Sequence, residues 1–307
     1  MKSDIATFLN GLAMGAANVI PGVSGGTIAL ITGIYERLIN GIKRCDPKAL
    51  KMVLKRDFKA AWEYVDGRFL FALMAGVAVS IVSLARLFEY LLEHHERLTM
   101  AFFFGLILLS IVYVAQRISA WTPSVWAALV VGSVIAVGIA FLAPATENSA
   151  FFYVFLCGVA AISSMILPGL SGSFVLIIMG NYALVLGAIN NFDLGIIIPL
   201  ALGCGFGLIA FSHILSWVFK HYANHTLAVM TGFVIGSLVV IWPWKQTLTE
   251  NVLREGKPPK EVVTGYDWQM PSIASSETWL ALGLMVLGAL SIVAMERVAG
   301  GKEKTAA

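Results

Sequence analysis

Two serines, Ser24 and Ser171, occupy the same short pattern of proline and glycine inside apolar sequence. The pattern reads Pro-Gly-Val-Ser-Gly at 21–25 and Pro-Gly-Leu-Ser-Gly at 168–172. Proline removes a backbone N–H and interrupts a helix, whereas glycine lets the chain turn. A helix that begins after such a turn presents unpaired N–H groups, which favour anions, and serine suits the cap position. The pattern therefore predicts a site for a phosphate or a carboxylate.

Other polar residues lie close to the two turns and extend the expected site. They are Asn18 and Thr27 near the first turn, and Ser163, Ser164 and Ser173 near the second. A simpler interpretation stays open, because small residues in membrane helices often serve only close packing. Two copies of one pattern at matching points of the chain favour the binding interpretation.

Charged residues within apolar sequence are few, and such residues are functional candidates by default. Arg37 and Arg86 are candidate phosphate ligands, and Glu36, Glu89 and His213 are candidates for coupling to an ion. Structural ion pairs or extension of the side chain to the membrane surface explain Arg37, Arg86 and Glu89 equally well. A packed neutral histidine is the favoured interpretation of His213. His221 and His225 are four residues apart but have no third partner in the sequence, so we expect no metal site.

The composition places these residues in a membrane protein. Of the 307 residues, 58% are hydrophobic and 13% are charged, whereas soluble domains carry about 25% charged residues. Apolar stretches long enough for the ~20 residues that cross a bilayer recur along the chain. The net charge of +3 is modest, and we expect neither a nucleic-acid partner nor a bound cofactor.

The chain contains an internal repeat. Sliding residues 8–42 by 147 positions aligns them with residues 155–189, and twelve of the 35 aligned positions are identical, including Gly33 with Gly180 and Tyr35 with Tyr182. A second block matches at an offset of 127, for example Gly76 with Gly203 and Gly105 with Gly232. The offsets differ by 147 − 127 = 20 residues, which indicates an insertion in the first half.

The repeat predicts an all-α polytopic membrane protein of two halves, 1–146 and 147–307. Each half has a broken, re-entrant hairpin and three transmembrane helices. The expected hairpins are 5–42 and 150–190, and the expected helices are 69–92, 98–116, 124–143, 195–219, 226–244 and 278–298. A hairpin contributes an even number of crossings and three helices an odd number. The halves therefore have opposite orientations, as in many secondary transporters.

Basic residues predict the sidedness. The insertion 43–68 contains eight lysines and arginines, and short basic loops stay in the cytoplasm. Because successive crossings alternate between the two sides of the membrane, this loop places both termini in the cytoplasm. It places the 245–277 loop outside, where we expect irregular structure.

The segment "GLAMGAANVIPGVSGGTIALITGIYERLINGIK", residues 11–43, resembles the bacterial polyprenyl-phosphate transporter family, formerly a membrane family of unknown function. The resemblance covers nearly the whole chain. It implies return of undecaprenyl phosphate, the carrier lipid of cell-wall synthesis, from the outer to the cytoplasmic leaflet of the inner membrane. It implies that the phosphate is bound by the motif residues of both turns. These are Asn18, Pro21, Gly22, Ser24, Gly25, Gly26 and Thr27 in the first copy, and Pro168, Gly169, Ser171, Gly172 and Ser173 in the second. It leaves open coupling to a proton or a sodium ion, and the oligomeric state.

Two other functions compete with lipid transport. A secondary transporter for a small soluble anion needs the same turns but no lipid tail. Integral undecaprenyl-diphosphate phosphatases also resemble inverted repeats with Pro-Gly-x-Ser turns, but their turns continue Ser-Arg-Ser and they carry a carboxylate-rich helix. Here Ser24 is followed by Gly25-Gly26 and Ser171 by Gly172-Ser173. The chain thus lacks the phosphate-gripping arginine at both turns, and we expect no enzyme activity.

Overall fold

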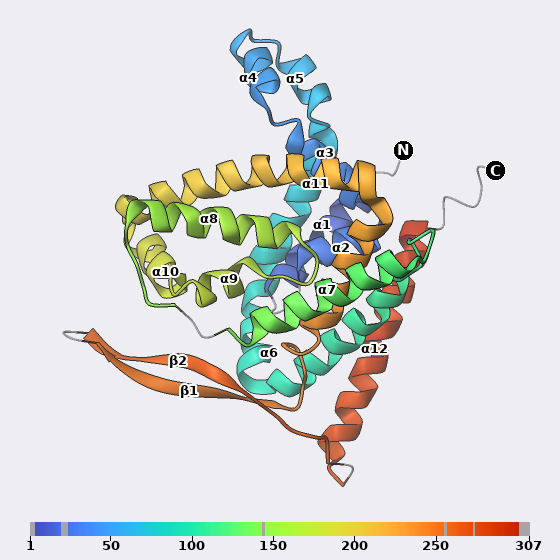
Figure 1. The fold of residues 1–307 in the computed structure, drawn as a ribbon, viewed down its shortest axis with the longest axis vertical. Coiled ribbons are helices and arrows are strands. Elements are labelled where there is room, and N and C mark those ends of the chain that lie inside the picture. The colour runs from blue at the N-terminus through green and yellow to red at the C-terminus, as the bar shows by residue number, and fades with distance from the viewer. Residues whose placement is uncertain (1–3, 20–23, 143–144, 255–256, 273, 301–307) are drawn as a thin grey trace.

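The computed structural model describes residues 4–19, 24–142, 145–254, 257–272 and 274–300. Each half opens with a hairpin of three helices rather than two (Figure 1). The first hairpin comprises α1 (Asp4–Val19), α2 (Gly25–Ile31) and α3 (Tyr35–Lys43). The second comprises α8 (Phe151–Ile166), α9 (Gly172–Ile178) and α10 (Tyr182–Asn191). The predicted breaks fall between α1 and α2 and between α8 and α9.

A second break in each hairpin was not predicted. It falls at Gly33 and at Gly180, whose φ angles of 72° and 74° lie in the left-handed region that favours glycine. The two glycines are 180 − 33 = 147 residues apart, which is the offset of the first repeat block. In the second hairpin, α9 and α10 meet at an angle of 116°. The returning arm of each hairpin is therefore bent.

Two long helical segments also bend at matching positions. They are α6 (Gly67–Ala115) and α11 (Leu194–Ser237). Non-helical backbone interrupts α6 at His95 (φ −139°, ψ 40°) and α11 at Tyr222 (φ −137°, ψ 46°). These residues are 222 − 95 = 127 apart, the offset of the second repeat block. Each segment thus supplies two of the three predicted helices of its half, and the third is α7 (Pro123–Ala140) or α12 (Ser276–Gly300).

The insertion in the first half folds into two short helices that project from one end of the molecule (Figure 1). They are α4 (Pro47–Leu54) and α5 (Phe58–Tyr64), capped by the side chains of Asp46 and Asp57. The 245–277 loop is not irregular as expected, because it forms an antiparallel hairpin of β1 (Lys245–Arg254) and β2 (Lys257–Trp268). Lys245 pairs with Trp268 at the base of this hairpin.

Glycines bring the helices into close contact in the same way in both halves. A Cβ atom at any of them would lie 1.9–2.4 Å from a carbonyl oxygen of the facing helix, closer than side chains approach. Gly11 and Gly76 join α1 to α6, as Gly158 and Gly203 join α8 to α11. Gly105 and Gly288 join α6 to α12, as Gly132 and Gly232 join α7 to α11. Each half therefore packs its last helix against the long segment of the other half.

Among the residues that the structure describes, five helical stretches are long and apolar enough to cross a membrane, and the bent pair α9–α10 gives a sixth when counted as one span. The five are Gly67–Leu84, His94–Ala115, Pro123–Ala140, Leu194–Ser237 and Ser276–Val293. The chain is thus an all-α polytopic membrane protein in which one β-hairpin connects two helices. Opposite orientation of the two halves stays a prediction.

We predict that Gly105→Ala destabilises the fold, because the added methyl would lie 1.9 Å from the Met285 carbonyl oxygen. Overpacking of this kind costs about 1–3 kcal/mol. Gly283→Ala on α12 is the matched control, because a Cβ there meets no atom within 4 Å. Thermal unfolding in detergent should show a lower midpoint for Gly105→Ala only. Equal midpoints for both variants would contradict the close helix contact.

We also predict that Cys45, beside the basic insertion, reacts with a membrane-impermeant thiol reagent only from the cytoplasmic side. A cysteine introduced at Lys257, in β2, should react only from outside, because the predicted topology separates the two positions by the bilayer. Labelling of intact cells and inverted vesicles measures both. Labelling of both positions from one side would rule out this topology.

Candidate functional site

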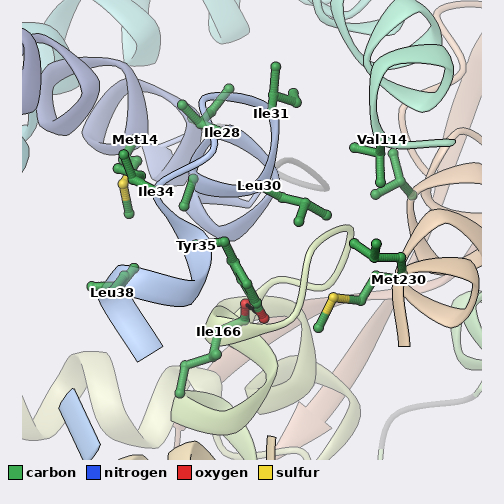
Figure 2. Close-up of a cluster of buried hydrophobic side chains, with 14 of the residues drawn as sticks. Met14, Ile28, Leu30, Ile31, Ile34, Tyr35, Leu38, Val114, Ile166 and Met230 are labelled. Atoms are coloured by element: carbon green, nitrogen blue, oxygen red, sulfur yellow. Dashed lines mark hydrogen bonds between the residues drawn. The ribbon is translucent and has the colours of Figure 1, made fainter. Parts of the chain in front are cut away.

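The two hairpin tips meet directly, through hydrogen bonds from the first hairpin to the end of α8. The last carbonyls of a helix have no partner inside the helix. Here the Ser24 hydroxyl lies 3.2 Å from both the Met165 and the Leu167 carbonyl oxygens. The Tyr35 hydroxyl donates to the Ile166 carbonyl oxygen over 2.9 Å, and Figure 2 shows the Tyr35 ring pointing toward Ile166. The break after α8 is thus satisfied by side chains of the other half.

One bond runs in the opposite sense across this contact. The Gly169 N–H donates to the Thr27 hydroxyl over 3.1 Å. Gly169 has φ +80°, and a Cβ there would lie 2.6 Å from the Phe233 carbonyl oxygen, so the turn requires glycine. We call the set of bonds that Ser24, Thr27 and Tyr35 form with residues 165–169 the tip junction. All three side chains are buried, with at most 2% of each residue exposed.

At the first tip, the N–H groups of residues 25–27 are all bonded within the protein. The Gly25 N–H donates to Asn18 Oδ1 (2.8 Å), the Gly26 N–H to Ser24 Oγ (3.1 Å) and the Thr27 N–H to the Ser24 carbonyl (2.9 Å). Gly26 also touches the second half closely, because a Cβ there would lie 2.5 Å from the Ile166 carbonyl oxygen. Ser24 thus caps α2 as predicted, but in this conformation its hydroxyl is fully engaged by protein groups.

The second tip is open by comparison. The Ser171 and Ser173 hydroxyls lie 2.8 Å apart and bond each other, and Ser171 does not cap α9. Ser173 is exposed and Ser171 half-buried. Within the described ranges, no acceptor bonds the N–H groups of Gly172, Ser173 or Phe174. Tyr182, the counterpart of Tyr35, is 37% exposed. Three backbone donors and two hydroxyls therefore gather at one accessible tip.

Close packing by the motif residues also shapes the tips. Pro168 is buried at the break after α8, where it has no N–H to leave unpaired. Gly172 packs against α8, where a Cβ would lie 2.8 Å from the Ala161 carbonyl oxygen. Ser164 bonds that same carbonyl from within α8. Pro21 and Gly22 lie outside the described residues.

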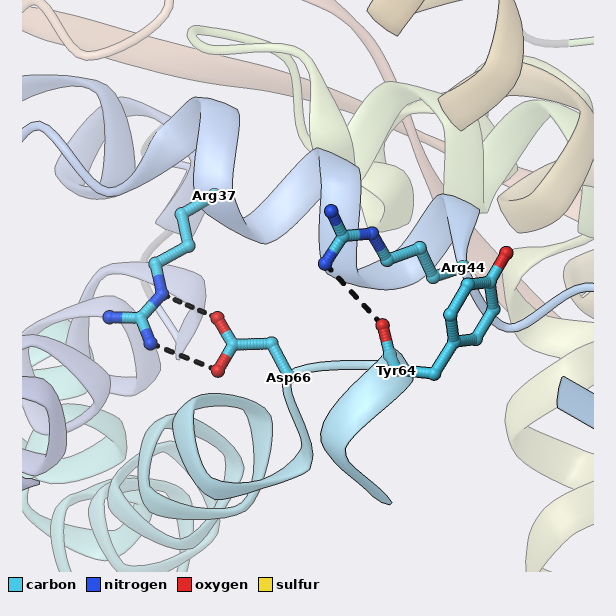
Figure 3. A network of polar contacts seen from close by, with 4 residues as sticks. All are labelled: Arg37, Arg44, Tyr64 and Asp66. Atoms are coloured by element: carbon cyan, nitrogen blue, oxygen red, sulfur yellow. Dashed lines mark hydrogen bonds and ion pairs between the residues drawn. The ribbon is translucent and has the colours of Figure 1, made fainter. Parts of the chain in front are cut away.

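The charged candidates lie apart from the tip contacts. Figure 3 shows the two-pronged ion pair of Arg37 with Asp66 (2.6 and 2.9 Å). The Arg37 guanidinium also lies over the Phe69 ring. The hydrogen bond from Arg37 lowers the pKa of the Asp66 carboxyl. Figure 3 also shows Arg44 donating to the Tyr64 carbonyl. These contacts fasten α3 to the insertion, which gives Arg37 a structural partner.

Glu36 is exposed on α3, and His213 bonds the Ile209 carbonyl of its own helix. The side chains of Arg86 and Glu89 lie outside the described residues. None of the coupling candidates that the structure describes bonds a residue of either tip. The ion-coupling assignments therefore stay predictions.

Sequence reasoning missed two residues of this region. Tyr35 was visible as an identity of the repeat, but nothing showed that its hydroxyl reaches α8. Arg117 Nη2 donates to the Ile31 carbonyl over 2.7 Å and so caps the end of α2. The equivalent carbonyl of Ile178, at the end of α9, accepts from the Ala145 N–H over 2.7 Å. Both short helices are thus held at their far ends by a donor from a distant segment.

Known proteins resemble this chain over most of its length. A polyprenyl-phosphate transporter of Vibrio cholerae is 40% identical over 298 residues, covering 96% of this chain and 97% of the relative. A polyprenyl-phosphate transporter of Staphylococcus aureus is 34% identical over 254 residues, covering 76% and 85%. No solved structure gave a significant match. Residues 14–258 match the VCA0040-like family, described as undecaprenyl phosphate translocase-like. The chain belongs to this undecaprenyl phosphate translocase-like family of membrane proteins.

Proposed function

We propose that this protein moves undecaprenyl phosphate from the outer to the cytoplasmic leaflet of the bacterial inner membrane, so that the carrier lipid is used again. The family and the names of both relatives support a polyprenyl phosphate as the cargo. Those names describe transporters and not enzymes. The polyprenyl tail stays in lipid during the step, and only the headgroup passes through protein.

The phosphate binds at the second tip. A phosphate carries several strong acceptor oxygens, and a bare charge in hydrocarbon is very costly. The protein must therefore offer a group of donors that replaces water. The contrast between the tips carries this proposal: every N–H group of residues 25–27 is bonded, whereas those of residues 172–174 have no partner among the described residues. The Ser171 and Ser173 hydroxyls complete the donor group.

The tip junction acts as the closed side of the pathway. It buries Ser24 and Thr27 while the second tip remains accessible. Because the halves repeat the same helices and bends, an exchanged arrangement is available, in which the second tip closes and the first opens. In inverted-repeat transporters, such an exchange moves access from one side to the other around a central site. The headgroup would pass from one tip to the other during this exchange.

A small soluble anion and a diphosphate remain the competing substrates. To test the small-anion alternative, transport of undecaprenyl phosphate between the leaflets of liposomes is compared with transport of inorganic phosphate in a parallel assay. Incubation with undecaprenyl diphosphate and measurement of released phosphate tests the diphosphate alternative. Loss of labelled lipid from the outer leaflet without phosphate release is the result that the proposed function requires.

The double change Ser171→Ala and Ser173→Ala should weaken headgroup binding and slow transport. Each hydrogen bond to a charged group contributes roughly 1–3 kcal/mol. Thermal stability should hardly change, because the two hydroxyls bond only each other. Ser291→Ala is the matched control, since Ser291 bonds its own helix in α12. Wild-type transport by the stable double variant would remove the second tip from the mechanism.

Tyr35→Phe and Ser24→Ala should behave differently, because their hydroxyls hold the tip junction. Each should lower the free energy of unfolding by about 1 kcal/mol through the loss of a buried hydrogen bond. Each should also make the first tip more reactive toward a thiol reagent at an introduced Thr27→Cys. Unchanged stability and unchanged labelling in both variants would show that the junction is not a gate.

The energy source is a further expectation. Inward movement of a phosphate opposes a membrane potential that is negative inside, at ~2.3 kcal/mol per charge per 100 mV. Transport in liposomes should therefore respond to an imposed proton or sodium gradient. A rate that ignores imposed pH, sodium and voltage gradients would identify a passive carrier.

A further inference from the structure

A charged pocket lies at the end of the molecule opposite the insertion. It is formed where α6 turns at His95, where β1 begins and where α12 begins (Figure 1). Its volume is about 370 Å³. The charged and titratable side chains that line it are His94, Glu96, Arg97, Lys245 and Glu277. The first half of α6 runs from the insertion to this pocket, so a cytoplasmic insertion places the pocket at the outer surface.

An apolar groove adjoins this pocket. Its volume is about 390 Å³, and its walls come from α6, from the end of α7 and from the segments that flank the β-hairpin. They include Phe104, Phe141, Leu238, Val239, Trp268 and Met270. Phe141 and Met270 are 61% and 89% exposed, so the groove is open on its outer side.

Trp242 lines both cavities. Its indole N–H donates to the Gln269 carbonyl over 3.1 Å. Its ring lies 5.3 Å from the Phe104 ring and 5.4 Å from the Trp244 ring, measured between centroids. These contacts fix the indole as a shared wall. A tryptophan with one apolar and one polar side is typical of the membrane–water interface.

We propose that these two cavities form one docking site for a lipid phosphate, with the phosphate between Arg97 and Lys245 and the first part of the lipid chain in the apolar groove. The site differs from the tips and lies before them on the path of a lipid that arrives from the outer leaflet. It rests on the proposed function only for the identity of the lipid, undecaprenyl phosphate.

The charges of the pocket suit an exchangeable anion. Arg97 is paired with Glu277 at 2.7 Å, and both side chains are more than two-fifths exposed. Such an exposed pair contributes about 0–1 kcal/mol, whereas a phosphate accepts two parallel bonds from a guanidinium. A lipid phosphate can therefore take Glu277's place on Arg97 at little cost.

Lys245 supplies the second cation. Burial lowers its pKa to about 8, opposed by the nearby Glu96 carboxylate. Its ammonium group contacts the Val240 carbonyl at the end of the α11 region. A buried ammonium gains from an added anion, because Coulomb attraction is stronger at low dielectric. His94, whose Nδ1 lies 3.0 Å from the Tyr90 carbonyl, and Glu96 complete the charged groups around it.

The combination of cavities selects among ligands. A neutral polyprenol fills the groove but leaves Arg97 with Glu277 and Lys245 with the Val240 carbonyl. Inorganic phosphate reaches the cations but buries no apolar surface. Only a lipid phosphate uses both cavities, and each part adds affinity to the other.

The test uses the full-length protein in nanodiscs and a photoactivatable undecaprenyl phosphate, with the crosslinked peptides mapped by mass spectrometry. Crosslinks should appear within 238–242 and 268–270. Arg97→Gln and Lys245→Gln should each reduce their yield at least fivefold. Excess undecaprenyl phosphate should compete, and excess undecaprenol or inorganic phosphate should compete at least tenfold less well.

Arg68→Gln is the matched control, because Arg68 forms a similar exposed ion pair with Asp4 (2.6 Å) at the other end of the same span. It should leave the crosslinks unchanged. Phe141→Ser tests the groove and should reduce the crosslink yield. Competition by inorganic phosphate should stay as weak as with the wild-type protein. Circular dichroism and melting of each variant identify a loss of fold.

Three outcomes overturn the inference. One is crosslinking at the tips alone while lipid transport proceeds, which leaves the proposed function intact. Another is equal competition by undecaprenol, which shows that the charged pocket takes no part. The third is an unchanged yield in folded Arg97→Gln and Lys245→Gln variants. Failure of the proposed function is distinct, because it shows as absence of lipid transport in the wild-type protein whatever the crosslinks.

Discussion

A helix that breaks inside a bilayer leaves backbone groups that lipid cannot bond, and the protein is organised around satisfying them. The carbonyls at the end of α8 receive hydroxyl bonds from Ser24 and Tyr35, which belong to the other half of the chain. The break after α8 is therefore not complete without the first hairpin. The broken hairpins are stable because they meet, and their meeting fixes the centre of the molecule.

The asymmetry of the two tips follows from the same constraint. Backbone donors of the first tip are bonded by Asn18 and Ser24, which frees its hydroxyls to serve the second half. The N–H groups of residues 172–174 have no equivalent partners among the described residues, and Ser173 beside them is exposed. Two nearly identical sequence patterns thus differ in this structure, since one tip is closed by hydrogen bonds and the other is not. In the proposed exchange, the second half would supply the bonds of the tip junction in place of the first. In the proposed function, binding and access are linked because the same groups serve both.

The sequence predicted the helices and the positions of the first breaks, because proline, glycine and apolar length act locally. Its assignment of a phosphate site to the polar groups of the tips stays a prediction. It did not show that Ser24 is engaged by carbonyls of residues 165 and 167, since this depends on how two distant hairpins dock. The second breaks, at Gly33 and Gly180, were visible in the sequence only as identical residues of the repeat. A glycine in apolar sequence more often marks close packing, so the breaks were not predicted. The β-hairpin was missed because alternation in 245–268 is weak and carries two prolines.

The exchange of last helices has a consequence for synthesis of the chain. Gly105 on α6 receives its partner only from Met285 on α12, which is 285 − 105 = 180 residues later. At ~5–20 residues per second, translation needs on the order of ten seconds or more to supply it. During this interval the glycine face of α6 lies bare in the membrane, and the same holds for α7 until α11 is inserted. The nascent first half is thus an incomplete structure that the insertion machinery must shield. Neither half is expected to persist when made alone, so the duplicated chain is one folding unit.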